Sequence, residues 1–199
     1  MLPFAVMPSR AALVGAADSV SGSSIVARKM TATSFNVKGV ADGAEYLTTY
    51  YDRGYTTAVS VDGGAVQINP SNLIATGLQL TVDLEKYSDT YVLVKYTITN
   101  SSAKSHTVKV GSFADVKIHD NDFAPIYAEK NGGDTLIMEG KPKNNYVFKL
   151  VATGCDTLWY GYYREREENC FTNMTDRGPK NTYTGDSALS YSWNATVAS

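Results

Sequence analysis

The chain has little of three things that many functional sites require: histidine, cysteine and a surplus of positive charge. Its 199 residues include 2 His and 2 Cys, and 18 Lys and Arg stand against 20 Asp and Glu, for a formal net charge of −2. Without a basic surplus the chain is poorly suited to neutralise a phosphate backbone, so we predict no nucleic acid partner. No apolar run approaches the roughly 18 residues of a transmembrane helix, so we predict no transmembrane segment.

The scarcity of histidine narrows the possible catalytic sites. A Ser-His-Asp or Cys-His site has to use His106 or His119, and no Gly-x-Ser-x-Gly nucleophile elbow occurs. No His-Glu-x-x-His or Cys-x-x-Cys zinc motif is present either. The carboxylates that a glycosidase or lyase would pair, such as Asp52, Asp83 and Glu165, have no distinguishing spacing. We therefore predict no catalytic residues, and a polysaccharide-degrading enzyme is the least favoured class.

Signals for β-strands are abundant instead. Apolar and polar residues alternate with period 2 over 78–84, 92–98 and 108–118. The connectors 85–90 and 100–106 are polar and of hairpin length, so we expect an antiparallel meander with one dry face. Further strand-like segments occur along the whole chain, and so many strands require two packed sheets. The sequence predicts an all-β, two-sheet antiparallel β-sandwich with minimal helix.

The domain organisation follows from length and from the N-terminal composition. A length of 199 residues fits one all-β domain. Residues 1–22 begin with an apolar stretch, but it lacks a basic start and is interrupted by Pro3, Pro8 and Arg10. We assign 1–22 to an N-terminal arm or trimmed signal segment and 23–199 to a single β-sandwich domain.

Two cysteines and three sequons bear on the compartment. A bridge between Cys155 and Cys170 would close a loop of about fifteen residues and stabilise the fold by roughly 3 kcal/mol. The alternative is two reduced, buried thiols, and the sequence leaves both open. The sequons at Asn100, Asn173 and Asn194 permit a glycoprotein in a eukaryotic secretory route.

One stretch is rich in oxygen ligands. Its members are Asp115, Asp120, Asn121 and Asp122. Calcium binds several carboxylate and carbonyl oxygens, which makes it the candidate cofactor of this chain. The spacing does not match an EF-hand, however, and Asp and Asn also cap tight turns through bonds from side chain to backbone.

Aromatic residues beside charged ones form the candidate ligand site. Sugars present apolar C–H faces that stack on rings, while Asp and Arg at the rim bond hydroxyl groups. The alternative is that these rings are core residues or cross-strand partners. The segment 157–163 is aromatic on both faces, and we expect one face to be covered and the other to be offered to a ligand or a neighbour. The candidate ligand-binding residues are Tyr50, Tyr51, Asp52, Arg53, Tyr55, Trp159, Tyr160, Tyr162, Arg164 and Trp193.

Several short motifs occur together between residues 40 and 195. They are Tyr96-Thr-Ile-Thr-Asn100, Val108-Lys-Val-Gly-Ser112, Asn121-Asp122 with Ala124-Pro125, Trp159-Tyr160-Gly161 and Ser192-Trp193. In this combination the chain resembles the β-sandwich domains of large secreted or surface proteins of gut bacteria and microaerophilic protists, whose layout is similar to the galactose-mutarotase-like supersandwich. The resemblance implies an extracellular or cell-surface location and non-catalytic adhesion or carbohydrate contact.

The same resemblance bears on how the sheets end. Chains of this kind continue beyond the Ser-Trp strand, so we expect a missing closing strand or one borrowed from a neighbour. An unpaired edge of that kind promotes strand addition. The favoured function is a surface interaction domain that binds glycans through exposed aromatics. The alternative is a structural or adhesive unit that self-assembles with neighbouring copies through strand edges.

Overall fold

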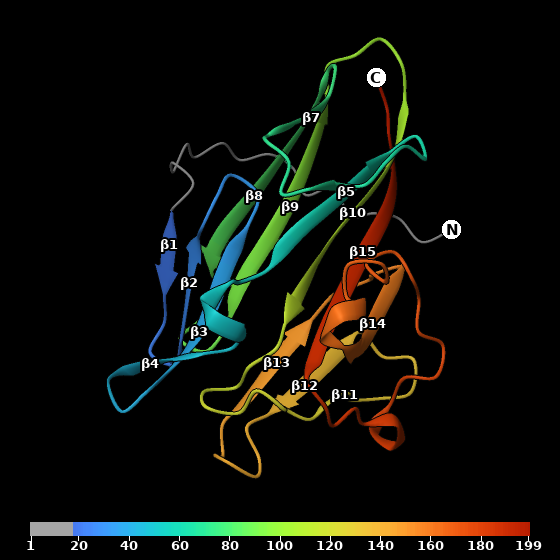
Figure 1. Cartoon of the computed structure of the whole chain (residues 1–199). Coiled ribbons are helices and arrows are strands. Elements are labelled where there is room, and N and C mark those ends of the chain that lie inside the picture. Colours follow the sequence, from blue (N-terminus) through green and yellow to red (C-terminus); the bar gives the residue numbers. More distant parts are fainter. Residues whose placement is uncertain (1–17) are drawn as a thin grey trace.

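The computed structural model describes residues 18–199. They form fifteen β-strands and three short 3₁₀ helices with no α-helix among them, which confirms the all-β prediction (Figure 1). None of the helices in this part of the chain is long and apolar enough to cross a membrane. The 3₁₀ helices are η1 (Tyr50–Asp52), η2 (Tyr163–Glu165) and η3 (Pro179–Asn181).

The largest sheet has the strand order β14-β15-β10-β5-β6. Its central strand β10 pairs with β15 along its whole length, from His106↔Val197 to Asp115↔Ala188, and with β5 on its other edge. The strands are β5 (Thr56–Val61), β6 (Gln67–Ile68), β10 (His106–Asp115), β14 (Thr157–Tyr162) and β15 (Ser187–Val197).

A second sheet has the order β1-β2-β3-β4. An Asp42-Gly43 turn, both residues with positive φ, closes the β3–β4 hairpin. Isolated bridges Phe35↔Tyr55 and Thr49↔Val116 join this sheet to the largest one. The first strand lies inside the segment 1–22 that the sequence assigns to an arm, whereas residues 1–17 of that segment lie outside the described residues. The strands are β1 (Ser19–Ser21), β2 (Ile25–Lys29), β3 (Phe35–Ala41) and β4 (Ala44–Leu47).

The other two sheets have three strands each, in the orders β7-β8-β9 and β11-β12-β13. All pairings in both are antiparallel. The strands are β7 (Leu73–Ala75), β8 (Leu78–Lys86), β9 (Val92–Asn100), β11 (Ile126–Ala128), β12 (Thr135–Glu139) and β13 (Val147–Val151).

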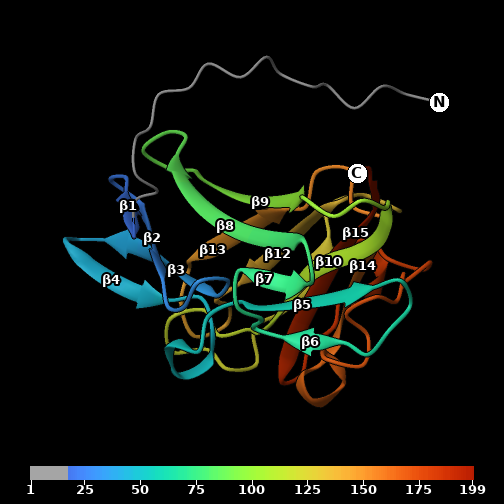
Figure 2. The ribbon, with the colours of Figure 1, turned by 90° about the horizontal axis from the view of Figure 1, so that it is seen from above.

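All four sheets contribute to one hydrophobic core. Its fully buried members include Val37 from β3, Leu84 from β8, Leu136 from β12 and Leu189 from β15. A smaller cluster lies between β8 and β10 and contains Leu80 and Val108, among others. The sheets therefore pack as a sandwich. In Figure 2, β8 and β9 lie in the upper layer of the picture, and β5 and β10 lie below them.

The expected meander is only half correct. β8 and β9 form the predicted hairpin, from Leu78↔Asn100 to Lys86↔Val92. The next strand, β10, does not pair with β9 but crosses to the largest sheet. Nearly all of β10 is buried, and a Cβ at Gly111 would lie 2.0 Å from the Tyr191 carbonyl oxygen. A strand so closely packed belongs at the centre of a sheet. Because β10 pairs with β15 and β5, β9 has a single partner among the described strands.

Candidate functional site

An apolar groove of about 620 Å³ lies between β9 and β13. We call it the β9–β13 groove. Side chains from β2, β3, β4 and the end of β15 also line it, so the groove opens onto the core of the sandwich. Pockets of this size and character are the usual ligand sites of proteins. The aromatic residues that line it are Phe35, Tyr46, Tyr55, Tyr87, Tyr91, Tyr96, Phe148, Tyr191 and Trp193.

One wall of the groove is the open edge of β9. The Tyr87 N–H donates to the Tyr91 carbonyl and the Ser101 N–H to the Gly77 carbonyl, which places the odd-numbered residues of β9 in hydrogen-bonded pairs with β8. In an antiparallel pair the intervening residues direct their N–H and C=O groups away from the partner. The backbone groups of Val92, Val94 and Tyr96 therefore point toward the groove side of β9.

The opposite wall is the open edge of β13. The Gly140 N–H donates to the Tyr146 carbonyl and the Ala152 N–H to the Asp134 carbonyl, so the even-numbered residues of β13 bond to β12. By the same alternation, the backbone groups of Val147, Lys149 and Val151 point away from β12. Within residues 18–199, neither β9 nor β13 has a second strand partner.

The two edges run in the same direction. In Figure 1 the arrows of β9 and β13 both point toward the top of the view. A single strand placed between them would thus be antiparallel to both. It would join the two three-stranded sheets into one continuous antiparallel sheet, because each side offers a row of free backbone groups.

Side-chain exposure follows this incomplete pairing. The inward-facing residues Val92, Val94 and Phe148 are only half-buried, although they pack against the core. Monomeric proteins rarely leave a contiguous apolar patch of large residues in water. Here five large apolar residues that are between 46% and 77% exposed line the groove: Tyr87, Tyr91, Leu93, Val147 and Val151.

The groove has almost no charge. Of the described residues that line it, Lys149 alone is charged, and its Nζ pairs with Glu129 Oε1 at 3.0 Å. The site therefore suits an apolar occupant with backbone hydrogen-bonding groups. Apart from Tyr55 and Trp193, the sequence candidates missed this groove. The available signal was that Leu93, Val147 and Val151 are apolar on faces that the alternation assigns to solvent.

Three of the predicted sugar-stacking residues belong to the core. Tyr55 is buried and stacks on Phe35 with ring centroids 5.0 Å apart. Tyr160 is buried and its hydroxyl donates to the Asn181 carbonyl at 2.9 Å, and Trp159 is buried beside it on β14. Residues 157–161 of β14 are buried on both faces, so this part of the segment offers no face to a ligand, and Tyr162 at the end of the strand is the exposed ring.

The remaining predicted residues lie in separate places. Tyr50, Tyr51 and Arg53 are at η1, where Tyr51 is 71% exposed and the Arg53 guanidinium lies over the Tyr50 ring at 6.0 Å. Asp52 accepts a hydrogen bond from Asn36 and pairs with Lys38 Nζ at 2.7 Å. The others are Tyr162 at the end of β14, Arg164 in η2 and Trp193 in the β9–β13 groove.

Half of the predicted calcium ligands serve a turn instead. Asp120 Oδ1 accepts a hydrogen bond from Asn144 at 2.6 Å. The Asn121 side-chain amide donates to the carbonyls of Gly140 and Lys141, and its oxygen accepts from the Phe123 N–H at 3.1 Å. In the part of the chain that the structure describes, no three His, Cys, Asp or Glu side chains are grouped to hold a metal.

Asp115 and Asp122 behave differently from the turn residues. Each has a buried Oδ1 atom without a hydrogen-bond partner. Burial raises the pKa of Asp115 to about 6, with the negative charges of Asp186 and Asp122 adding to the rise and Arg166 opposing it. The end of β10 thus carries a carboxyl group that holds its proton more tightly than usual.

Cys155 and Cys170 are free thiols and not a disulfide, but only Cys170 is buried as the reduced alternative expects, whereas Cys155 is half-buried. The two side chains pack in different clusters: Cys155 against the main core, and Cys170 with Ala58 and Phe113. Burial raises the pKa of the Cys170 thiol to about 12, which keeps it protonated and unreactive at neutral pH.

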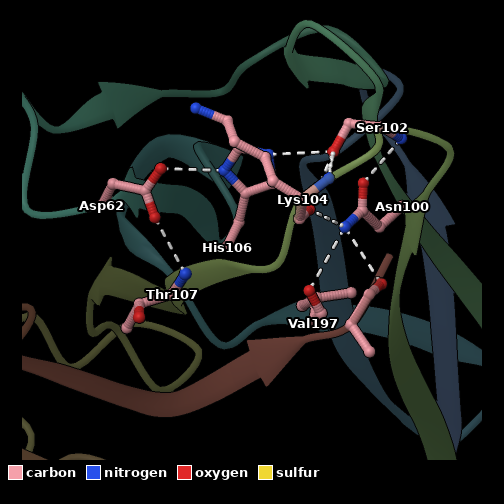
Figure 3. Close-up of polar contacts among 8 residues, drawn as sticks. Asp62, Asn100, Ser102, Lys104, His106, Thr107 and Val197 are labelled. Carbon is pink, nitrogen blue, oxygen red and sulfur yellow. Dashed lines mark hydrogen bonds and ion pairs between the residues drawn. The ribbon is translucent and has the colours of Figure 1, made fainter.

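A hydrogen-bonded chain of Ser, His and Asp lies where β9 passes to β10 (Figure 3). His106 Nδ1 lies 2.8 Å from Asp62 Oδ2, and His106 Nε2 lies 3.1 Å from Ser102 Oγ. Asp62 Oδ1 also accepts from the Thr107 N–H at 2.9 Å. The sequence did not predict this contact, because Asp62 and His106 are 44 positions apart and only the β5–β10 pairing brings them together.

This arrangement fastens three chain segments, and we call it the β9–β10 clasp. The Ser102 hydroxyl donates to the Lys104 carbonyl at 2.9 Å, inside its own turn. Asn100 Nδ2 donates to the carbonyls of Lys104, Val197 and Ala198, which ties the turn to the end of β15. The hydrogen bond from His106 lowers the pKa of Asp62, with the Thr107 N–H contributing next. None of these residues lines the groove.

Comparison of the chain with protein-family models, with curated proteins and with solved structures finds no match. The resemblance to supersandwich domains therefore stays a prediction.

Proposed function

We propose that this chain is a non-catalytic interaction module that self-associates by accepting an extended strand of a second copy in the β9–β13 groove. The observation that carries the proposal is the pair of open strand edges, facing one another across an apolar gap and running in the same direction. Strand addition to such edges gives affinity through main-chain hydrogen bonds and specificity through alternate side chains. On the family resemblance, the setting we propose is extracellular or at the cell surface.

The backbone edges favour a peptide over a small apolar ligand. An oily ligand in the groove would cover the N–H and C=O groups of Val94 and Lys149 without bonding them, which is costly. A strand bonds both rows and also covers Leu93, Val147 and Val151. The low net charge of −2 means that two copies repel one another only weakly.

The test is the association state of the full chain, measured by light scattering and sedimentation over a wide concentration range. Val94→Pro removes one N–H that faces the groove but none that bonds β8, and Lys149→Pro does the same on β13. Both changes should weaken association about tenfold or more, because each deletes a hydrogen bond of the added strand. Leu73→Asp is the matched control, since Leu73 is 59% exposed but lies outside the groove.

Association that is unchanged in both proline variants would contradict the proposal, as would a monomer at every concentration. The same runs with calcium and with chelator test the predicted cofactor. We expect equal association in both, because two of the four predicted ligands are engaged in a turn.

Glycan binding is the second candidate, and the exposure of Tyr51 beside Tyr50 and Arg53 favours it. A ring this exposed next to a guanidinium is suited to stacking on a sugar. Saturable binding on a glycan array that is lost in Tyr51→Ala, and kept in the distant control Tyr87→Ala, would support this candidate. The absence of saturable binding would exclude it.

A further inference from the structure

We infer that the strand entering the β9–β13 groove is residues 9–17 of a neighbouring copy, so that copies join head to tail. This inference rests on the proposed function and names its donor segment. Three properties carry it: the composition of the segment, the face that it would present and the path of the chain where the described residues begin.

Residues 9–17 have the composition that the groove requires. The sequence Ser-Arg-Ala-Ala-Leu-Val-Gly-Ala-Ala contains no proline, whereas Pro8 stands immediately before it. A strand bonded on both edges cannot contain proline within it. The nine residues match the nine residues of β9, and their only charge is Arg10, which suits a groove whose single charged residue is already paired.

Only one face of this segment can enter the groove. Alternation places Ala11, Leu13, Gly15 and Ala17 on one side of an extended strand and Arg10, Ala12, Val14 and Ala16 on the other. In the proposed strand the second face, which carries the charge, would stay in water, and Leu13 would then point inward. Small residues around one leucine suit a floor that large aromatic side chains already occupy.

The path of the chain keeps the copy's own residues 9–17 out of the register that places residue 17 beside Val92. A strand antiparallel to β9 reaches Val92 at its C-terminal end, beside the turn where the Ser24 N–H donates to the Asp89 carbonyl. Asp18 lies at the opposite end of β1, where its carbonyl accepts from the Lys29 N–H. The four residues from Asp18 to Gly22 span about 13 Å of strand, while Ala17 must stay within about 3.8 Å of Asp18.

A donor and an acceptor on different parts of the chain make a heterologous contact. Such contacts generate rings or open filaments and not closed symmetric dimers. Each copy would give its strand to the next and receive one from the copy before it. The inference therefore predicts assemblies larger than dimers that have one free groove at an end or none in a ring.

The test uses full-length variants that separate the donor from the acceptor. Leu13→Asp places a charge on the inward face and should weaken self-association about tenfold or more, whereas Val14→Asp on the outward face should change it by no more than about threefold. The chain with Leu13→Asp keeps an intact groove, and the chain with Val94→Pro keeps an intact donor. Mixed together, these two variants should form a 1:1 pair that grows no further.

A second measurement uses a synthetic peptide of residues 9–17. Added to the Leu13→Asp chain, it should bind saturably and shift the emission of Trp193, which lines the groove. The same peptide with proline at position 13 should not bind. A groove that is disrupted by Val94→Pro should also fail to bind the original peptide.

The outcomes separate the two proposals. Self-association that is lost in Val94→Pro but unchanged in Leu13→Asp overturns the donor assignment and leaves the strand-accepting function standing. Equal weakening by Leu13→Asp and Val14→Asp also overturns the donor strand and its face. If Val94→Pro has no effect either, both proposals fail.

Discussion

β9 and β10 are neighbours in sequence with the same alternation of apolar residues, yet they end in opposite situations. β10 has a partner on each edge, and its Val108 and Val110 are buried. Among the strands of residues 18–199, β9 has one partner, and its Val92 and Val94 are only half-buried. Their sequences differ little in hydrophobicity, so the difference shows that a strand is buried by its neighbours in the sheet.

The contrast extends to the strands around them. β15, which pairs with β10, and β14, which pairs with β15, are buried along most of their length, whereas β13 has no fully buried residue. The molecule thus has a closed region around β10 and an open seam between β9 and β13. Changes in the closed region should affect stability, and changes in the seam should affect association.

The largest effect should come from the closed region. Leu189→Ala removes a fully buried side chain of β15 and should lower the free energy of unfolding by about 2–5 kcal/mol. The matched change Leu150→Ala on half-buried β13 should cost less than half as much in the monomer, because water already reaches that site. Chemical denaturation of both variants checks this, and equal losses would break the distinction between the two regions.

The β9–β10 clasp should rank second, since it fixes the N-terminal end of β10. His106→Ala removes the bonds to Asp62 and Ser102 and should cost about 1–3 kcal/mol in thermal or chemical unfolding. We also expect wild type and Ser102→Ala to take up equally little of a fluorophosphonate probe. Stoichiometric labelling of Ser102 in wild type would instead show a nucleophilic serine.

At the C-terminal end of β10, Asp115 should make the free energy of unfolding depend on pH. Because the folded-state pKa of Asp115 is raised to about 6, protonation of this carboxyl favours the folded state. That stability is present below the ordinary aspartate pKa and is lost as the pH rises through 6. Asp115→Asn should therefore be about 1–2 kcal/mol more stable than wild type at pH 7 and equal to it near pH 3. Denaturation series at several pH values measure this, and parallel curves would contradict it.

The smallest effect on stability should come from the seam. Leu93→Ser changes an exposed side chain of β9 and should move the unfolding free energy of the monomer by no more than about 0.5 kcal/mol. The same change should weaken self-association, because the added strand covers this residue. A large loss of monomer stability with unchanged association would reverse the comparison between seam and closed region.

Part of the site could be predicted and part could not. Alternation correctly predicted the strands, but the open edges of β9 and β13 were not predicted. The unpaired edge was expected beyond the Ser-Trp strand, and that strand, β15, has a partner on each side in the described part of the chain. The aromatic candidates failed at Tyr55, Trp159 and Tyr160, because composition cannot tell a core ring from an exposed one. The β9–β10 clasp could not be predicted from the sequence either, since Asp62 and His106 meet only through the pairing of β5 with β10.

Local sequence patterns are sufficient to specify that the chain is all-β, where its strands lie and that a strand can follow β9 after a short polar turn. These are local properties, because period-2 alternation and turn chemistry depend on neighbouring residues. The pairing of β10 with β15 and β5, at the centre of another sheet and not beside β9, depends on the tertiary structure. Strand partners are chosen by packing between distant segments, so the open seam between β9 and β13 exists only in the folded molecule.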